Sequence, residues 1–185
     1  MTIGVLALQG SFMPHLAVLK GLGVPCAPVR RSDELRGCAG LILPGGESTT
    51  LIRQLEFIHL LEPLRVFAQS KPCFGTCAGL ILLSDTQIDA RHKGLAILDV
   101  TVERNAYGSQ IDSFSETISV EGQSIHAIFI RAPKILRCGS AVELLATHSG
   151  VPVLVRQGHH LGATFHPELS GNPSIHRVFV KNCAP

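Results

Sequence analysis

Residues 71–83 read KPCFGTCAGLILL: a short apolar run, a cysteine between two glycines, and a second apolar run. The pattern predicts a strand over residues 73–76 that turns at Cys77 into a helix opening at residues 78–83. Gly75 and Gly79 give the segment the G-x-nucleophile-x-G form of a nucleophile elbow, in which a tight turn lifts the central side chain above the edge of a sheet. The stretch therefore predicts a strand–turn–helix unit of an α/β sheet.

The rest of the amino-terminal half repeats this alternation of strand and helix. Apolar runs at residues 3–8, 24–29 and 39–43 indicate strands, and apolar residues at helical spacing follow the first and the third of them. We expect Ser48 to cap the helix after the third strand. Because strands that alternate with helices are joined by right-handed crossovers, this half is predicted to form a doubly wound parallel sheet with both faces covered.

From residue 95 onward the pattern changes to short strands with turn signals between them, which predicts an antiparallel or mixed portion. The candidate strands cover residues 95–102, 116–120, 127–130, 142–147, 153–156 and 162–165. A last helix is expected from Pro173, which suits a first-turn position, to about Lys181. Since the 185 residues contain no repeat or linker, we expect a single domain spanning residues 1–185.

Composition and charge restrict the partners and the compartment. The net charge is only +2 and the basic residues are scattered, which argues against nucleic-acid binding. No apolar run approaches the ~20 residues that cross a bilayer, and the chain enters a strand pattern without a basic leader, so we expect a cytoplasmic protein without membrane contact. The six cysteines are widely spaced and lack zinc-site partners, which predicts reduced thiols and no metal. No motif indicates a bound cofactor.

Two interpretations of Cys77 stay open on the local pattern. As a nucleophile, the thiol would gain from the positive end of the following helix, which favours a thiolate. The N–H of Ala78 would then point to where an oxyanion forms. As a structural residue, Cys77 would be a small buried side chain, which is the commoner fate of cysteine.

A base for this thiol is offered by ATFHPEL, residues 163–169. His166 and Glu168 are two residues apart at the end of an extended run, so both side chains are able to point to one side. The carboxylate could then fix the imidazole tautomer, as in a catalytic triad. The alternative is a capping or surface histidine beside a solvated charge. His15, His59, His148 and the His159–His160 pair are interpreted as surface or satisfied histidines without a role.

A third candidate segment is LPGGESTT, residues 43–50, in which a strand is followed by two glycines and a helix start. Free backbone N–H groups at such a turn suit an anion. A phosphate-binding turn is the alternative, but the Walker pattern and its lysine are missing. A carboxylate or an oxyanion therefore fits this turn better.

The order of Cys77, His166 and Glu168 resembles the Cys-His-Glu triad of the class I glutamine amidotransferases. Within that class, six segments resemble, in the same order, signatures of the glutaminase subunits of pyridoxal 5'-phosphate synthase. They are LALQG (6–10), PGGEST (44–49), GTCAG (75–79), RNAYG (104–108), FIRAP (129–133) and FHPEL (165–169). The resemblance spans nearly the whole chain and implies a three-layer, flavodoxin-like α/β fold.

The resemblance also implies an activity: hydrolysis of L-glutamine to L-glutamate and ammonia, which passes to a separate pyridoxal 5'-phosphate synthase subunit in a hetero-oligomer for vitamin B6 synthesis. By that resemblance, Cys77 attacks the side-chain amide, His166 shuttles protons and Glu168 orients His166. Oxyanion donors are implied at Gly46 and Ala78. The positions that match the glutamine site of the family are Gly46, Glu47, Ser48, Arg104, Ile130 and Arg131.

Two departures from the family pattern concern Pro14 and Ser109, where the family often has Glu and Arg. They leave the triad untouched but remove charges relevant to docking. Two other functions stay open beside the glutaminase. One is a thiol amidase on the same scaffold that feeds ammonia to a different synthase, and the other is a non-catalytic binding or regulatory domain.

Overall fold

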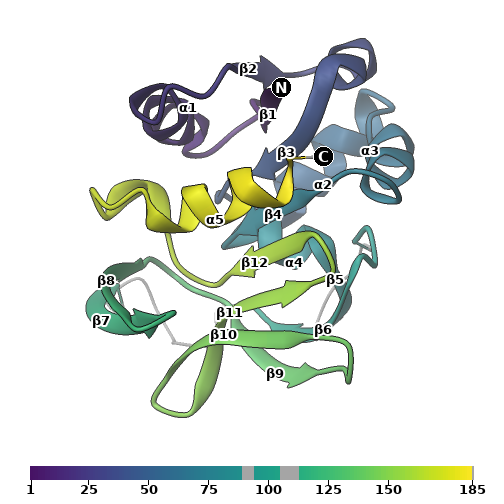
Figure 1. The fold of residues 1–185 in the computed structure, drawn as a ribbon. Helices are drawn as coiled ribbons and strands as arrows, with labels where there is room; N and C mark the ends of the chain where they lie inside the picture. The colour runs from purple at the N-terminus through teal and green to yellow at the C-terminus, as the bar shows by residue number, and fades with distance from the viewer. Residues whose placement is uncertain (89–93, 105–112, 185) are drawn as a thin grey trace.

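The computed structural model describes residues 1–88, 94–104 and 113–184, and a seven-stranded sheet forms its centre (Figure 1). In spatial order the strands are β10 (Glu143–His148), β11 (Val151–Gln157), β12 (His160–Ala163), β4 (Cys73–Thr76), β3 (Cys38–Leu43), β1 (Thr2–Leu6) and β2 (Cys26–Val29). From β12 to β2 neighbouring strands run parallel. β10 and β11 add an antiparallel edge. The predicted doubly wound, mostly parallel sheet with an antiparallel portion is therefore confirmed.

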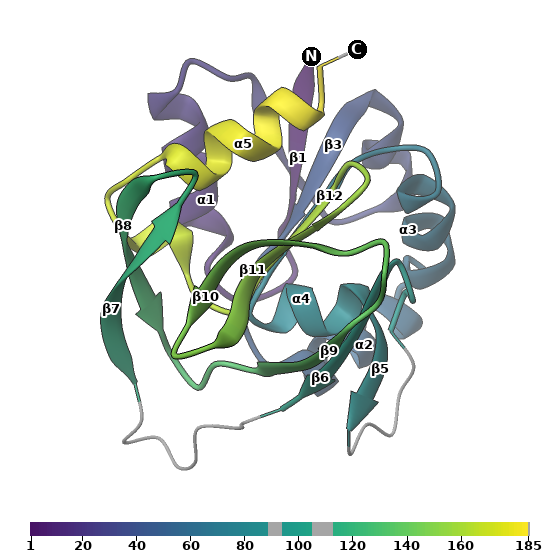
Figure 2. The same cartoon turned by 60° about the horizontal axis from the view of Figure 1, so that its bottom comes forward.

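Two layers cover the faces of this sheet, and Figure 2 shows them on opposite sides. One layer consists of α2 (Ser48–Phe57), α3 (Leu61–Ala68), α4 (Ala78–Leu83) and a small sheet of β5 (Ser84–Ile88), β6 (Leu98–Glu103) and β9 (Lys134–Cys138). The other consists of α1 (Phe12–Gly21), α5 (Ser174–Asn182) and the hairpin of β7 (Phe114–Val120) and β8 (Gln123–Phe129). Two short 3₁₀ helices, η1 (Ser32–Gly37) and η2 (Pro167–Leu169), lie in connections.

The central strands are apolar on both faces because both faces are covered. In β3, Leu41 and Leu43 pack into the cluster beneath α2, α3 and α4, whereas Ile42 packs into the cluster beneath α1 and α5. This is the alternation that a strand buried on both sides requires. The covering helices are short, and in the described parts of the chain none combines the length and apolarity needed to cross a membrane.

Two expected helix starts were wrong for local reasons. Glu47, not Ser48, caps α2, because its longer carboxylate accepts from the backbone N–H groups of both Thr49 and Thr50 at 3.0 and 2.6 Å. Pro173 precedes α5 instead of occupying its first turn.

Two strands were missed altogether. β5 follows α4 without a break, and β9 has mixed polarity along its length. Neither segment therefore carries the bounded apolar run or the strict alternation by which a strand is recognised in a sequence.

Candidate active site

Cys77 and His166 meet because they follow neighbouring parallel strands. β4 ends one residue before Cys77, β12 ends three residues before His166, and Thr76 pairs with Ala163 in register. The carboxyl ends of parallel strands share one edge of a sheet, where α/β proteins place their ligand sites. The backbone N–H of Cys77 also donates to the carbonyl of Ala163 at 2.9 Å. The two segments are thereby tied together at this edge.

The turn at Cys77 has the geometry of a nucleophile elbow. Cys77 has φ 50° and ψ −106°, a backbone conformation that side-chain-bearing residues rarely adopt. A Cβ at Gly75 would collide with the backbone of Gly79, and a Cβ at Gly79 would collide with the carbonyl of Leu43. The glycines are thus required by the close approach of α4 to β4 and β3. The residue is less open than the elbow pattern indicated, since Cys77 is only 6% exposed.

His166 and Glu168 form a buried pair beside this thiol. Nδ1 of His166 lies 2.8 Å from Oε1 of Glu168, and the hydroxyl of Ser11 donates to the same oxygen at 2.6 Å. Because an ionised carboxylate only accepts, Nδ1 carries the hydrogen. The second ring nitrogen of His166 is therefore left for Cys77.

The electrostatics of the pair favour its charged form. Burial lowers the pKa of His166, but hydrogen bonding and electrostatic attraction to Cys77 and Glu168 outweigh burial and raise that pKa to about 10. Burial likewise opposes ionisation of Glu168. The hydrogen bonds from His166 and Ser11 and the electrostatic effect of His15 and His166 outweigh it, and the pKa of Glu168 falls to about 2. At neutral pH the pair is an imidazolium and a carboxylate.

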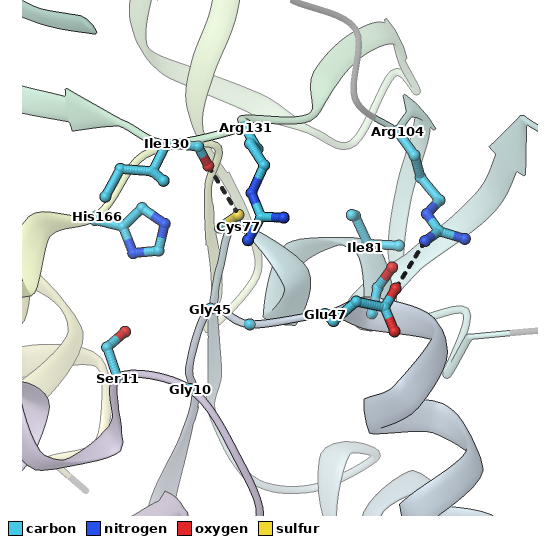
Figure 3. A pocket seen from close by; sticks show the side chains of 12 residues that line it. Gly10, Ser11, Gly45, Glu47, Cys77, Ile81, Arg104, Ile130, Arg131 and His166 are labelled. Atoms are coloured by element: carbon cyan, nitrogen blue, oxygen red, sulfur yellow. Dashed lines mark hydrogen bonds and ion pairs between the residues drawn. The ribbon is translucent and has the colours of Figure 1, made fainter. Parts of the chain in front are cut away.

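A pocket of about 290 Å³ opens at this edge of the sheet, with Cys77 and His166 in its wall (Figure 3). Its volume lies at the lower end of the ~300–1,000 Å³ of typical ligand sites, so it suits a small metabolite. The residues matched to a glutamine site all line it: Gly46, Glu47, Ser48, Arg104, Ile130 and Arg131. Ala78 follows Cys77 in the chain, and Glu168 stands behind His166.

The wall of the pocket carries charges of both signs. Nη2 of Arg104 lies 3.1 Å from Oε1 of Glu47. Burial raises the pKa of Glu47, yet hydrogen bonds from Thr50 and Thr49 outweigh it and lower the pKa to about 2. Arg131 has φ 45°, and Figure 3 shows its side chain beside Cys77. The thiol of Cys77 contacts the carbonyl of Ile130 at 3.9 Å.

Sequence reasoning assigned no role to His15, which the structure buries completely and places with Nε2 3.4 Å from Oε2 of Glu168. A weak signal existed, since Ser11 and His15 are four residues apart, the spacing that places side chains on one helix face. Pro14 lies in the first turn of α1, where a missing N–H is tolerated. Ser109 and residues 105–108 of RNAYG lie outside the described residues.

Comparison with solved structures supports the fold and the class. A crystal structure of a glutamine amidotransferase superposes with a TM-score of 0.93 at 44% identity and covers 98% of both chains. A putative GMP synthase component from Thermoplasma acidophilum gives a TM-score of 0.72 at 19% identity, covering 99% of this chain and 94% of the other. At that identity the second likeness concerns the fold alone.

Comparison with curated sequences narrows the class to a family. The pyridoxal 5'-phosphate synthase subunit PdxT of Thermosipho africanus is 48% identical over 97% of both chains. PdxT of Bacillus velezensis is 45% identical over 98% of this chain and 94% of its own. The model of the SNO glutamine amidotransferase family matches residues 5–185. The resemblance indicated by the six motifs is thus confirmed, and this chain belongs to the SNO glutamine amidotransferase family.

Proposed function

We propose that this chain is the glutaminase subunit of a pyridoxal 5'-phosphate synthase, hydrolysing L-glutamine to L-glutamate and ammonia. The observation that carries the proposal is the convergence of Cys77 and His166 on one pocket, with His166 held by Glu168 at 2.8 Å. Residues 1–185 act as one glutaminase domain in this proposal. Its support is the family match over residues 5–185 and the packing of both hydrophobic clusters on one sheet.

The first half of the reaction forms a thioester. The sulfur of Cys77, as a thiolate, attacks the amide carbon of glutamine, and the carbonyl π electrons move to oxygen. The His166 imidazolium then gives its proton to the amide nitrogen. The carbon–nitrogen bond breaks as the carbonyl re-forms, and ammonia leaves. Cys77 now carries a γ-glutamyl thioester, and His166 is neutral.

The second half releases glutamate. Neutral His166 takes one proton from water while the water oxygen attacks the thioester carbon, and the carbon–sulfur bond breaks. The second hydrogen of the water stays on the new γ-carboxyl group, which loses it to solvent to give glutamate. Cys77 returns as a thiolate beside an imidazolium, which is the starting state. In both halves negative charge develops on the carbonyl oxygen. The backbone N–H groups of Ala78 and Gly46 are proposed to donate to it.

The charges of the pocket match a free amino acid, which carries a carboxylate and an ammonium on its α-carbon. We assign the α-carboxylate to Arg131, with Arg104 as a second cation, since a guanidinium donates two parallel hydrogen bonds to a carboxylate. Glu47, ionised at neutral pH, faces the same pocket and attracts the ammonium group. Gly46, Ser48 and Ile130 complete the wall along the side chain of glutamine.

The ammonia is proposed to pass to a separate synthase subunit in a hetero-oligomer that makes pyridoxal 5'-phosphate, as the PdxT relatives are subunits of that enzyme. We place the reaction in the cytoplasm. The six cysteines are free thiols in the structure, which suits a reducing compartment.

The test is glutamate release from L-glutamine by this chain, alone and with a pyridoxal 5'-phosphate synthase subunit, beside a Cys77→Ala control. Release that depends on Cys77 and rises with the synthase subunit supports the proposal. Cys77→Ala is expected to remain folded and to bind the synthase subunit, since it removes one small side chain. Turnover retained in Cys77→Ala would exclude Cys77 as the nucleophile.

A further inference from the structure

A buried row of polar side chains continues behind the candidate triad. Nε2 of His15 lies 3.4 Å from Oε2 of Glu168 and 3.4 Å from Oγ1 of Thr76. On the other side of the ring, Nδ1 of His15 lies 2.9 Å from Nε2 of His176. Both histidines are fully buried, although α1 and α5 supply them from opposite ends of the chain.

The two oxygens of Glu168 have different surroundings. Oε1 takes the hydrogen bonds of His166 and Ser11. Oε2 receives no hydrogen bond of normal geometry from the described residues, and the polar atom that faces it is Nε2 of His15 at 3.4 Å. A buried carboxylate oxygen without a donor is costly. The position of His15 is therefore suited to fix the orientation of the Glu168 carboxylate.

The partners fix the tautomers of both rings. A nitrogen that faces an ionised carboxylate carries a hydrogen, so Nε2 of His15 carries it, hydrogen-bonded to Oγ1 of Thr76 and facing Oε2 of Glu168 at 3.4 Å, while Nδ1 is the acceptor. His176 must then donate from Nε2 to Nδ1 of His15. Its own Nδ1 is left without a partner among the described residues. The opposite tautomers would aim a lone pair at Glu168 and bury an unpaired N–H.

Both imidazole rings are uncharged at neutral pH. Burial, assisted by His166 and opposed by Glu168, lowers the pKa of His15 to about 4. Burial, assisted by His15 and opposed by Glu168, lowers the pKa of His176 to about 3. Thr76 lies beside the same ring, and Phe74 packs against it in a T-shaped arrangement. A neutral donor orients Glu168 without cancelling the negative charge on which His166 depends.

We propose that His15, held in one tautomer by His176, is a positioning residue for glutamine hydrolysis: it fixes Oε2 of Glu168 so that Oε1 stays aimed at His166. The proposal rests on the glutaminase function proposed above. His15 is not among the residues that line the pocket, so its effect reaches the substrate through Glu168 and His166.

The first experiment replaces His15 in the full chain and assays it with the synthase subunit. His15→Leu keeps the bulk and removes the donor, His15→Asn keeps an amide too short to reach Glu168, and His15→Gln keeps an N–H near the place of Nε2. We expect kcat to fall about 10-fold or more in the Leu and Asn variants with KM unchanged, as when a supporting partner of a reactive group is lost. His15→Gln should retain kcat within about threefold by the same reasoning.

The pH profile separates positioning from packing. Without the His15 donor the pKa of Glu168 rises, so the acidic limb of the kcat profile should move to higher pH in His15→Leu and His15→Asn. The shift should be smaller in His15→Gln, which keeps a donor but cannot become the cation that His15, with a pKa of about 4, becomes in acid. A loss of kcat without this shift, or a loss that His15→Gln does not rescue, would overturn the proposal. So would unchanged kcat and profile in folded His15→Leu or His15→Asn, with folding checked by circular dichroism and thermal melting.

His176 provides an independent test, because its task is to set the tautomer of His15. His176→Leu should lower kcat in the wild-type background and have no further effect in the His15→Gln background, since an amide has no tautomer to set. Equal losses of kcat in both backgrounds would mean that His176 acts only through packing, and would overturn the proposal that it sets the tautomer of His15. If His15→Leu and His15→Asn do not fold, this comparison still tests whether the tautomer of His15 matters for kcat.

An assay that does not use glutamine distinguishes failure of the positioning role of His15 from failure of the glutaminase function. The rate at which iodoacetamide alkylates Cys77, followed by mass spectrometry of the Cys77 peptide, reports on the Cys77–His166–Glu168 group in the chain alone. Its pH profile should shift in His15→Leu and shift less in His15→Gln. If wild type releases no glutamate but the alkylation profile shifts, the glutaminase function fails and the positioning role stands. If wild type is active and neither profile shifts, the positioning role alone fails.

Discussion

Oε1 of Glu168 lies 2.8 Å from Nδ1 of His166, and both groups are almost completely buried. The two residues are separated only by Pro167, which starts η2 and turns the chain so that both side chains project to the same side. Such a short connection leaves the carboxylate little freedom to move independently of the imidazole. The geometry suits a carboxylate that orients the base and stabilises its charged form.

Glu168→Gln should therefore lower kcat by roughly 10³- to 10⁴-fold, a smaller loss than in Cys77→Ala, because an amide stabilises the imidazolium poorly but leaves nucleophile and base in place. The measurement is steady-state glutamate release with the synthase subunit. Glu143→Gln, which breaks an exposed pair with Arg156, is a matched control and should leave kcat unchanged. A Glu168→Gln protein as inactive as Cys77→Ala would indicate a more direct role for the carboxylate.

The layered fold could be predicted because its information is local. β4 and α4 have the predicted bounds, since an apolar run, a glycine-flanked turn and a second apolar run follow one another directly. β5 and β9 are held by pairing with β6, which lies far from β9 in the sequence. Such strands owe their structure to tertiary contacts and lack a strong pattern of their own.

The residues that line the pocket could be predicted from motifs, whereas the buried histidines behind Glu168 could not. Cys77, Glu47 and His166 lie in segments whose glycines and prolines mark them, and they line one pocket. His15 and His176 lie 161 residues apart on two helices, and each looks like an isolated histidine in the sequence. Only the packing of α1 and α5 on the same face of the sheet brings them together.

Gly45→Ala should displace the His166 ring. A Cβ at Gly45 would collide with Cε1 of His166, and the ring is the group that must move. A shift of about 1 Å in a catalytic group lowers rates by roughly 10²-fold, which is the expected loss in kcat. Gly37→Ala, where a Cβ meets open space, is the control and should be neutral. Wild-type kcat in Gly45→Ala would show that His166 has room that the structure does not indicate.

Arg131→Gln should weaken glutamine binding more than the chemical step. A charge-assisted hydrogen bond is worth ~1.5–3 kcal/mol, so KM is expected to rise about 10- to 100-fold while kcat changes less. Arg137→Gln removes an exposed arginine that pairs with Asp99 and should leave KM unaltered. A lower kcat at constant KM would indicate that Arg131 acts in the chemical step and not in substrate binding.

The His166–Glu168 pair should stabilise the fold within a defined range of pH. Glu168 has a pKa of about 2 in the folded protein against an ordinary 4.5, so its contribution is complete above pH 4.5 and is lost as pH falls towards 2. His166 has a folded pKa of about 10 against an ordinary 6.5, so its contribution is complete below pH 6.5 and is lost as pH rises towards 10. Both contributions are complete only between pH 4.5 and 6.5.

The measurement is the free energy of unfolding of wild type minus that of Glu168→Gln, from urea titrations at several pH values. The difference should be largest between pH 4.5 and 6.5 and should narrow on both sides. Glu168 raises the pKa of His15 and of His176, so their titration in acid differs between the two proteins, and the alkaline side of the range, which reports on His166, is the cleaner comparison. A difference that is constant with pH, or largest in alkali, would mean that the two residues do not form a charged pair in the folded protein.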